Sequence, residues 1–133
     1  MTAMTATSAS DQLIRRALLA NGVFCMASGL GMAALSGPLS DWIGAPRLVL
    51  VLIGVGLVPW GAMLFAFSRR AEVRRADAWS AIAGDEAWVI GTLILVLGFP
   101  TALSSAGNAL AVVVALVVAA FAVVQYLGLR RTM

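Results

Sequence analysis

Few side chains in this 133-residue chain are able to do chemistry, and most of them fall near the same depth of an otherwise apolar sequence. The segment Asp85–Glu86–Ala87–Trp88 places two carboxyl groups beside an indole. Two amides stand apart from it: Asn21 lies five residues after Arg16, and Gln125 lies five residues before Arg130. In apolar surroundings, carboxyl and amide groups are able to bind a cation or polar ligand, to carry a proton, or to hold helices together.

Other kinds of chemistry are excluded by residue type. The chain has no histidine and a single cysteine, Cys25. These counts exclude haem with histidine ligands, metal sites built on histidine, a histidine general base and an internal disulfide. We therefore expect no enzyme activity, no catalytic residue, no cofactor and no metal site.

The composition indicates where these groups lie. Hydrophobic residues make up 62% of the chain and charged residues 11%, whereas soluble domains average about 45–50% and about 25%. So few charges could not cover the surface of a small soluble globule, and so much apolar surface would not stay solvated as a disordered chain. We therefore expect the lipid bilayer as the main partner and no nucleic acid partner.

The spacing of the charges predicts four membrane-spanning helices. Residues 17–40, 48–68 and 87–129 carry no charge, and one span needs about 20 apolar residues. The third stretch is long enough for two spans, with a turn signal near its middle in the segment 100–108. After a disordered tail, 1–12, we expect one all-α transmembrane domain, 13–133, folded as an up-down bundle. Its helices are predicted at about 14–36, 47–68, 86–103 and 108–129.

The arginines predict the orientation of these helices. With four spans, all the arginines except Arg47 fall on the same side of the membrane. Arginine and lysine are enriched on the cytoplasmic side, so both termini are predicted to be cytoplasmic in a multi-pass protein of the bacterial inner membrane. The arginines on that side are Arg15, Arg16, Arg69, Arg70, Arg74, Arg75, Arg130 and Arg131.

The connection 69–84 before the third span is rich in arginine. Its charges are spaced as on a surface helix, with Val73, Trp79 and Ile82 placed to face lipid. One interpretation is a solvated loop that only fixes orientation. The alternative is a docking surface for anionic lipid or a partner protein, formed by Arg69, Arg70, Arg74, Arg75 and Trp79.

The amides and the acids are expected to meet near the cytoplasmic end of the bundle. Asn21 and Gln125 each lie about 7.5 Å inside an arginine, on antiparallel helices, and the third span begins on the same side. In a purely structural interpretation, Asp85 and Glu86 cap that helix and oppose its dipole, while the two amides bond each other. The alternative is a ligand or proton site formed by Asn21, Asp85, Glu86, Trp88 and Gln125.

Short motifs in three of the predicted spans carry a resemblance. They are Asn21-Gly22 with Ser28-Gly29, Asp85-Glu86-Ala87-Trp88, and the segment 125–131. With them, the chain resembles a widespread kind of small four-helix bacterial integral membrane protein, which implies the fold and brings no activity. In size it is also similar to the small multidrug resistance transporters, four-helix dimers with a membrane-embedded glutamate in the first helix. The first span here contains no acid.

Two functions remain open from the sequence. The first is a non-catalytic membrane protein, either an accessory or structural subunit of another membrane protein or a homo-oligomeric bundle. It agrees with the missing catalytic residue types and with the short connections between spans. The alternative is a small transporter or channel with a cytoplasm-facing polar site around Asn21, Asp85, Glu86 and Gln125. We expect no ionisable group deep in any span, which leaves proton coupling without an obvious carrier.

Overall fold

The structure is a computed structural model that describes the backbone of residues 2–132 and the side chains of residues 12–130. Within this part of the chain the fold is entirely helical, which confirms the predicted all-α class. The helices are α1 (Thr2–Ala34), α2 (Ser36–Ile43), α3 (Arg47–Arg69), α4 (Arg75–Gly98) and α5 (Ser105–Thr132).

Four of these helices are long and apolar enough to cross a membrane, as the sequence predicted. The candidate spans are 23 to 26 residues long, and about 20 residues suffice for the hydrocarbon core. They are Gln12–Ala34, Arg47–Arg69, Arg75–Gly98 and Ser105–Arg130. The protein is therefore a multi-pass membrane protein by the length and composition of its helices.

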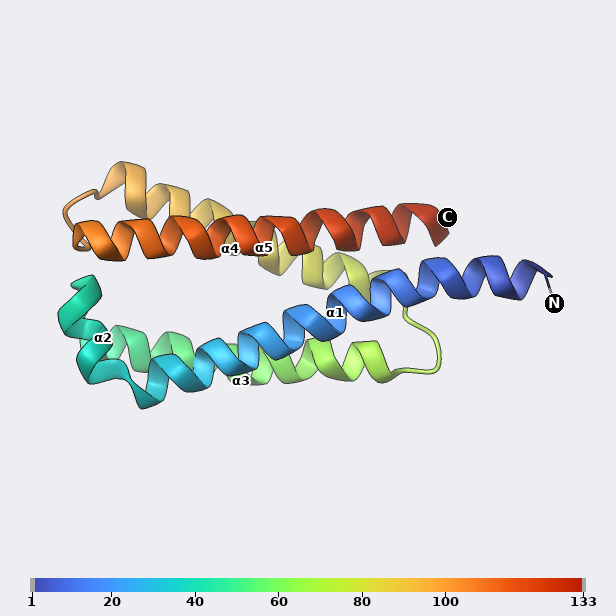
Figure 1. The fold of residues 1–133 in the computed structure, drawn as a ribbon, viewed down its shortest axis with the longest axis horizontal. Helices are drawn as coiled ribbons and strands as arrows, with labels where there is room; N and C mark the ends of the chain where they lie inside the picture. The colour runs from blue at the N-terminus through green and yellow to red at the C-terminus, as the bar shows by residue number, and fades with distance from the viewer. Residues whose placement is uncertain (1, 133) are drawn as a thin grey trace.

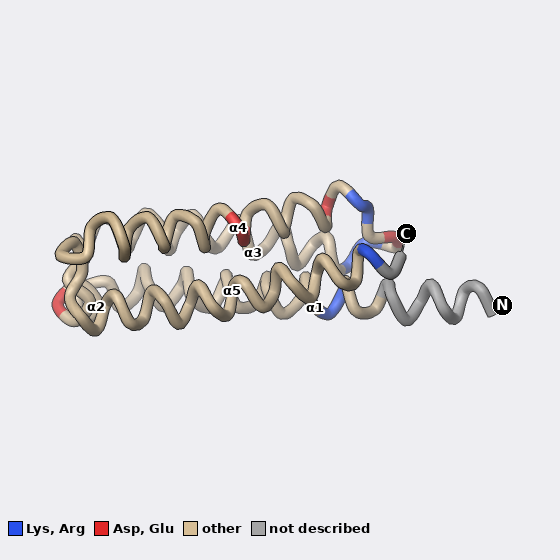
Figure 2. Tube along the Cα trace, turned by 90° about the horizontal axis from the view of Figure 1, so that it is seen from above, with Lys and Arg blue, Asp and Glu red and all other residues tan. Residues whose placement is uncertain are grey.

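The long helices form two antiparallel pairs (Figure 1). Helix α1 runs along α3, helix α4 runs along α5, and the pairs meet chiefly through α1 and α5. Figure 1 shows both ends of the chain at one end of the molecule, with α2 at the other. Figure 2 shows arginine gathered at the end where the termini lie, whereas α4 carries acidic residues about halfway along the molecule. That the arginine end is cytoplasmic remains a prediction.

Paired glycines bring α1 and α3 into backbone contact. A Cβ atom on Gly22 would lie 2.8 Å from the carbonyl oxygen of Gly61, and one on Gly29 would lie 2.5 Å from that of Gly54. In turn, a Cβ atom on Gly61 would lie 2.6 Å from the carbonyl oxygen of Gly22, and one on Gly54 would lie 2.6 Å from that of Gly29. Small residues at such points are the usual way for membrane helices to approach closely, so these pairs fix the register of α1 against α3.

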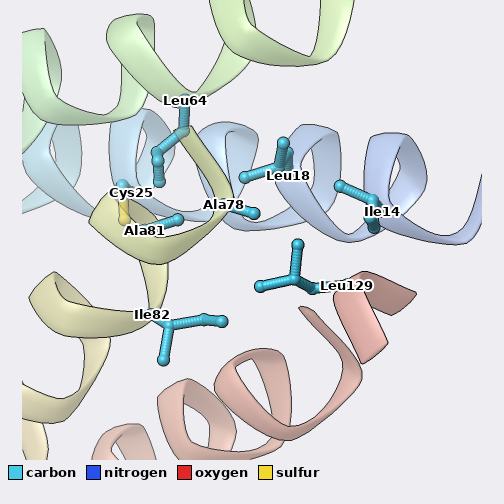
Figure 3. Packing of buried hydrophobic residues seen from close by; sticks show 8 residues of the cluster. All are labelled: Ile14, Leu18, Cys25, Leu64, Ala78, Ala81, Ile82 and Leu129. Carbon is cyan, nitrogen blue, oxygen red and sulfur yellow. The ribbon is translucent and has the colours of Figure 1, made fainter. Parts of the chain in front are cut away.

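The apolar core lies toward the end that holds both termini. Figure 3 shows its buried side chains converging from α1, α3, α4 and α5. Leu18 and Leu64 are fully buried there, against the small side chains of Ala78 and Ala81 on α4. The remaining members are Ile14, Cys25, Ile82 and Leu129. The sequence of α4 thus provides a face of small residues at helical spacing that lets it approach α1 and α3 here.

The opposite end is closed by contacts between α2 and the start of α5. Gly44 ends α2 with φ of 80°, a backbone conformation that favours glycine. Ser104 then joins the two segments: its N–H donates to the carbonyl of Ile43, and its hydroxyl donates to that of Trp42. The same hydroxyl oxygen accepts from the N–H of Gly107 at 3.0 Å, which caps α5.

The helix boundaries differ from the predicted ones in two places. The third span begins at Arg75 and ends at Gly98, rather than covering about 86–103. The positions of the charged residues predicted that the span starts only after Asp85. In the structure, α4 already includes Asp77 and Asp85, and both side chains are buried within the protein. Helix α1 begins at Thr2, within the stretch 1–12 that the sequence predicted as a disordered tail. Several alanines in this stretch favour helix.

Candidate functional site

A buried cluster of Asn21, Asp85 and Gln125 joins α1, α4 and α5. The Nδ2 group of Asn21 donates to both carboxylate oxygens of Asp85, at 3.0 Å each, and lies 3.3 Å from Oε1 of Gln125. The Nε2 group of Gln125 donates to Oδ2 of Asp85 at 2.7 Å. Both amides therefore turn their donors toward one carboxyl group, as buried polar groups require.

The cluster is enclosed by the protein. Asn21 and Gln125 are 0% exposed, and Asp85 is 3% exposed. The thiol of Cys25 extends the cluster by one member, since its Sγ donates to Oδ1 of Asn21 at 3.4 Å. The spacing of four residues places Cys25 and Asn21 on the same face of α1.

Glycine and alanine residues let the helices that carry the cluster come together. On α4, Ala78 and Ala81 precede Asp85 on one face, so this face fits against the core (Figure 3). Gly84 lies against the ring of Trp60, where a Cβ atom would come within 2.2 Å of the indole. On α5, Gly128 lies against the side chain of Ile14 in the same way.

The polar surroundings of the Asp85 carboxyl group are the amide groups of Asn21 and Gln125. Among residues 12–130 the carboxyl group makes no ion pair, and its hydrogen bonds come from the two amides. A carboxyl group inside a membrane protein normally faces other helices and marks either a polar joint or a pathway for ions or protons. This arrangement can fix α4 against α1 and α5 while it is closed. It would present a single acidic site if the helices separated.

The structure brings together three of the five residues in the predicted polar cluster. Glu86 is exposed on the outside of α4 and makes no contact with the cluster. Trp88 is half-buried, and its indole Nε1 is buried without a hydrogen-bond partner among the described residues. The interpretation of Asp85 and Glu86 as a helix cap is wrong, because α4 begins ten residues before Asp85. The expectation that no ionisable group lies deep in a span is also wrong, because Asp85 is buried midway along one.

The predicted loop 69–84 is mostly helix. Only residues 70–74 connect α3 to α4. In it, Arg70 forms an ion pair with Asp77 at 2.9 Å and lies over the ring of Phe67 at 5.0 Å. Arg69 lies over the ring of Phe65 at 5.8 Å. The arginines of this region are therefore partly held against the protein.

The remaining side chains of this region divide between surface and core. Arg74 and Arg75 are exposed. Trp79 is 41% exposed and packs edge-on against Tyr126, with 6.2 Å between ring centroids. Ile82, which was expected to face lipid, is instead 4% exposed within the core, because the helix extends past it and turns it inward.

Arg15 holds the end of α3, which sequence reasoning missed. Its guanidinium donates to the carbonyl of Ser68 at 3.0 Å and of Ala71 at 2.7 Å, and also to that of Arg70. The last carbonyls of a helix have no partner within it, so a cation there is favourable. Nothing in the sequence pairs Arg15 with residues so distant in the chain.

Comparison with models of protein families, with curated proteins and with solved structures found no match. By the length and composition of its helices, the chain belongs to the class of multi-pass, all-helical membrane proteins.

Proposed function

We propose that this chain is a non-catalytic protein of the bacterial inner membrane that serves as an accessory or structural subunit. The observation that carries the proposal is the closed hydrogen bonding of Asn21, Asp85 and Gln125. Each polar group of the cluster is already engaged by another, and the side chains are 0–3% exposed. A group that is to bind a substrate needs access and a free donor or acceptor.

The cluster then acts as a joint between the helix pairs. Hydrogen bonds between membrane helices each contribute about 0.6 kcal/mol and at most about 1.7 kcal/mol. These hydrogen bonds also determine how the helices are aligned, because Asp85 meets both amides only in one register of α4 against α1 and α5. Such a joint supports a small protein that offers a partner a fixed arrangement of helices.

A second candidate, a small transporter or channel, is favoured by one specific observation. Asp85 is an ionisable group inside a candidate span, and such residues commonly lie on ion or proton pathways. In this candidate Asp85 is the group that a proton or cation occupies, and Asn21 and Gln125 position its carboxyl group. It requires the helix pairs to separate at the cluster, because the closed form gives Asp85 almost no exposure.

Replacement of Asp85 by asparagine, with Ser28→Ala as the matched control, distinguishes the two functions. The side chain keeps its size but loses its charge, whereas Ser28 lies on the same helix as Asn21 but outside the cluster. We expect purified wild-type protein in liposomes to give no flux of protons or monovalent cations above that of empty liposomes. After mild detergent extraction, we expect both variants to co-purify with the same stoichiometric membrane partner as the wild type.

A different flux result would support the transporter or channel instead. A flux driven by pH or membrane potential that Asp85→Asn abolishes and Ser28→Ala preserves would replace the first proposal with the second. The measurement requires that the variants insert in liposomes in equal amounts, which circular dichroism and gel analysis of the vesicles establish.

A further inference from the structure

Glu86 is the residue whose position the fold itself does not explain. It follows Asp85 directly on α4, but successive residues of a helix point about 100° apart. Asp85 is therefore buried at 3% exposure while Glu86 is exposed on the outer side of the helix. Among the described residues, Glu86 has no hydrogen bond and no ion pair.

Glu86 lies within the candidate membrane span Arg75–Gly98, well away from both of its ends. It lies eleven residues after Arg75, or about 16 Å along the helix. The adjacent Asp85 lies level with Asn21, which is about 7.5 Å beyond Arg16 on α1. Glu86 is thus about 9–16 Å inside the arginine end, and Figure 2 shows acidic colour on α4 away from the basic colour at that end. A glutamate side chain is too short to return from this depth to the headgroups.

The helix face around Glu86 is also uncovered. Beyond it, α4 exposes a stripe of large apolar side chains at helical spacing, four, seven, eight and eleven residues further on. As a whole, α4 packs along α5 but has few contacts with α1 or α3. The exposed fractions are 55% for Ile90, 48% for Leu93, 59% for Ile94 and 76% for Leu97.

Lipid explains the apolar part of this face but not the acid at its end. A charged side chain turned toward lipid tails is costly and rare, and in membrane proteins such a group normally pairs with another. A helix that covered the stripe and carried a cationic side chain at the depth of Glu86 would satisfy both features. The charge of Glu86 therefore specifies the chemistry of the occupant.

We propose that the outer face of α4, formed by Glu86, Ile90, Leu93, Ile94 and Leu97, binds a transmembrane helix of another protein. That helix is apolar and carries one lysine or arginine at the depth of Glu86. The proposal rests on the proposed function as an accessory subunit and names the chemistry of its partner.

A second copy of this chain does not meet the same requirement. In a parallel dimer formed through this face, Glu86 would lie opposite Glu86, and like charges repel. None of the four candidate spans carries an arginine between its first and last few residues. An inverted copy would place its arginine-rich end on the opposite side of the membrane, against the arginine bias of the sequence.

The direct test measures binding to synthetic single-span peptides in phosphatidylcholine vesicles. The peptides are polyleucine helices that are identical except for a central lysine or leucine, so the lysine lies at mid-depth in either orientation. Binding is followed by energy transfer from a fluorescent protein fused to the C-terminus to a dye on the peptide. We expect the lysine peptide to bind at least about tenfold more tightly than the leucine peptide. Glu86→Gln should remove this preference, whereas Glu72→Gln, at an exposed acid in the α3–α4 connection, should preserve it.

A second measurement examines the native partner. A photo-reactive amino acid in place of Ile90 should cross-link to a protein whose span carries lysine or arginine at the matching depth, and Glu86→Gln should reduce that product about tenfold or more. The same reactive group in place of Leu116, which is 66% exposed on α5, should not give that product. Equal binding of the two peptides, an unchanged preference in Glu86→Gln, or cross-linking to lipid alone or to a second copy would overturn the proposal. The flux assay on Asp85 is independent of these outcomes, so the proposed function and the docking surface can fail separately.

Discussion

Removing the amide of Asn21 should weaken the helix assembly by an amount that depends on the charge of Asp85. The Nδ2 group makes three contacts, two to the carboxylate and one of 3.3 Å to Gln125. It has only two hydrogens, so the contacts amount to two hydrogen bonds. At about 0.6–1.7 kcal/mol for each bond between membrane helices, Asn21→Ala should lower the free energy of unfolding by about 1–3 kcal/mol.

The double-mutant cycle with Asp85→Asn makes this prediction specific. In the Asn21→Ala background, the carboxylate keeps only the donor of Gln125, and a buried charge with too few partners is costly. Removing that charge should then be far less harmful than in the wild type. We expect the double variant to be more stable than the sum of the single effects predicts, by about 1 kcal/mol.

Reversible unfolding by SDS in mixed micelles, followed by tryptophan fluorescence, measures each free energy of unfolding. The chain has four tryptophans, and Trp60 lies against α4 at Gly84, close to the cluster. The control Ser28→Ala should change stability by less than about 0.5 kcal/mol. If the effects of Asn21→Ala and Asp85→Asn add within about 0.3–0.5 kcal/mol, the two side chains are not coupled and the inferred joint does not exist.

The same structure makes three other predictions. Gly29→Ala should lower the free energy of unfolding by about 1–3 kcal/mol in the same SDS assay, because the new Cβ atom meets the backbone of α3. Gly31→Ala, with open space around it, should leave this free energy unchanged or raise it by up to about 1 kcal/mol. Equal effects would contradict the close contact of the helices. Arg15→Ala should speed amide hydrogen exchange in residues 70–74 about tenfold through the loss of hydrogen bonds from a charged donor, and Arg16→Ala, which is exposed, should leave it unchanged. A fluorescent reporter fused to the C-terminus should be active in the cytoplasm, and a cysteine introduced at Thr101 should react with a membrane-impermeant reagent from outside; the opposite pattern would reverse the predicted orientation.

The spans were predictable from sequence because long gaps between charges are a direct record of the hydrocarbon region. The same rule misplaces the start of α4, since it assigns Asp77 and Asp85 to the region outside the membrane, whereas both lie within the helix. The spacing of Ala78, Ala81 and Asp85 repeats every three to four residues and was the signal for a helix that buries its acid. Charge position alone gives no account of which side of a helix a residue faces.

The meeting of Asn21 with Gln125 followed from simple arithmetic, because equal distances from Arg16 and Arg130 on antiparallel helices give equal depths. The structure adds which acid joins them, and the 100° step between Asp85 and Glu86 decides it. The contact of Gly22 with Gly61 was not predictable, because every span contains small residues. Their partners depend on which helices become neighbours in space.

The division into two helix pairs also has a consequence for how the protein is made. Helices α1 and α3 leave the ribosome before α4 and α5, and their glycine contacts form a complete antiparallel hairpin without any later segment. Until the second hairpin arrives, the Nδ2 group of Asn21 has neither Asp85 nor Gln125 to donate to. In the order of synthesis, the donor of Asn21 is therefore present before Asp85, and that of Gln125 only after it.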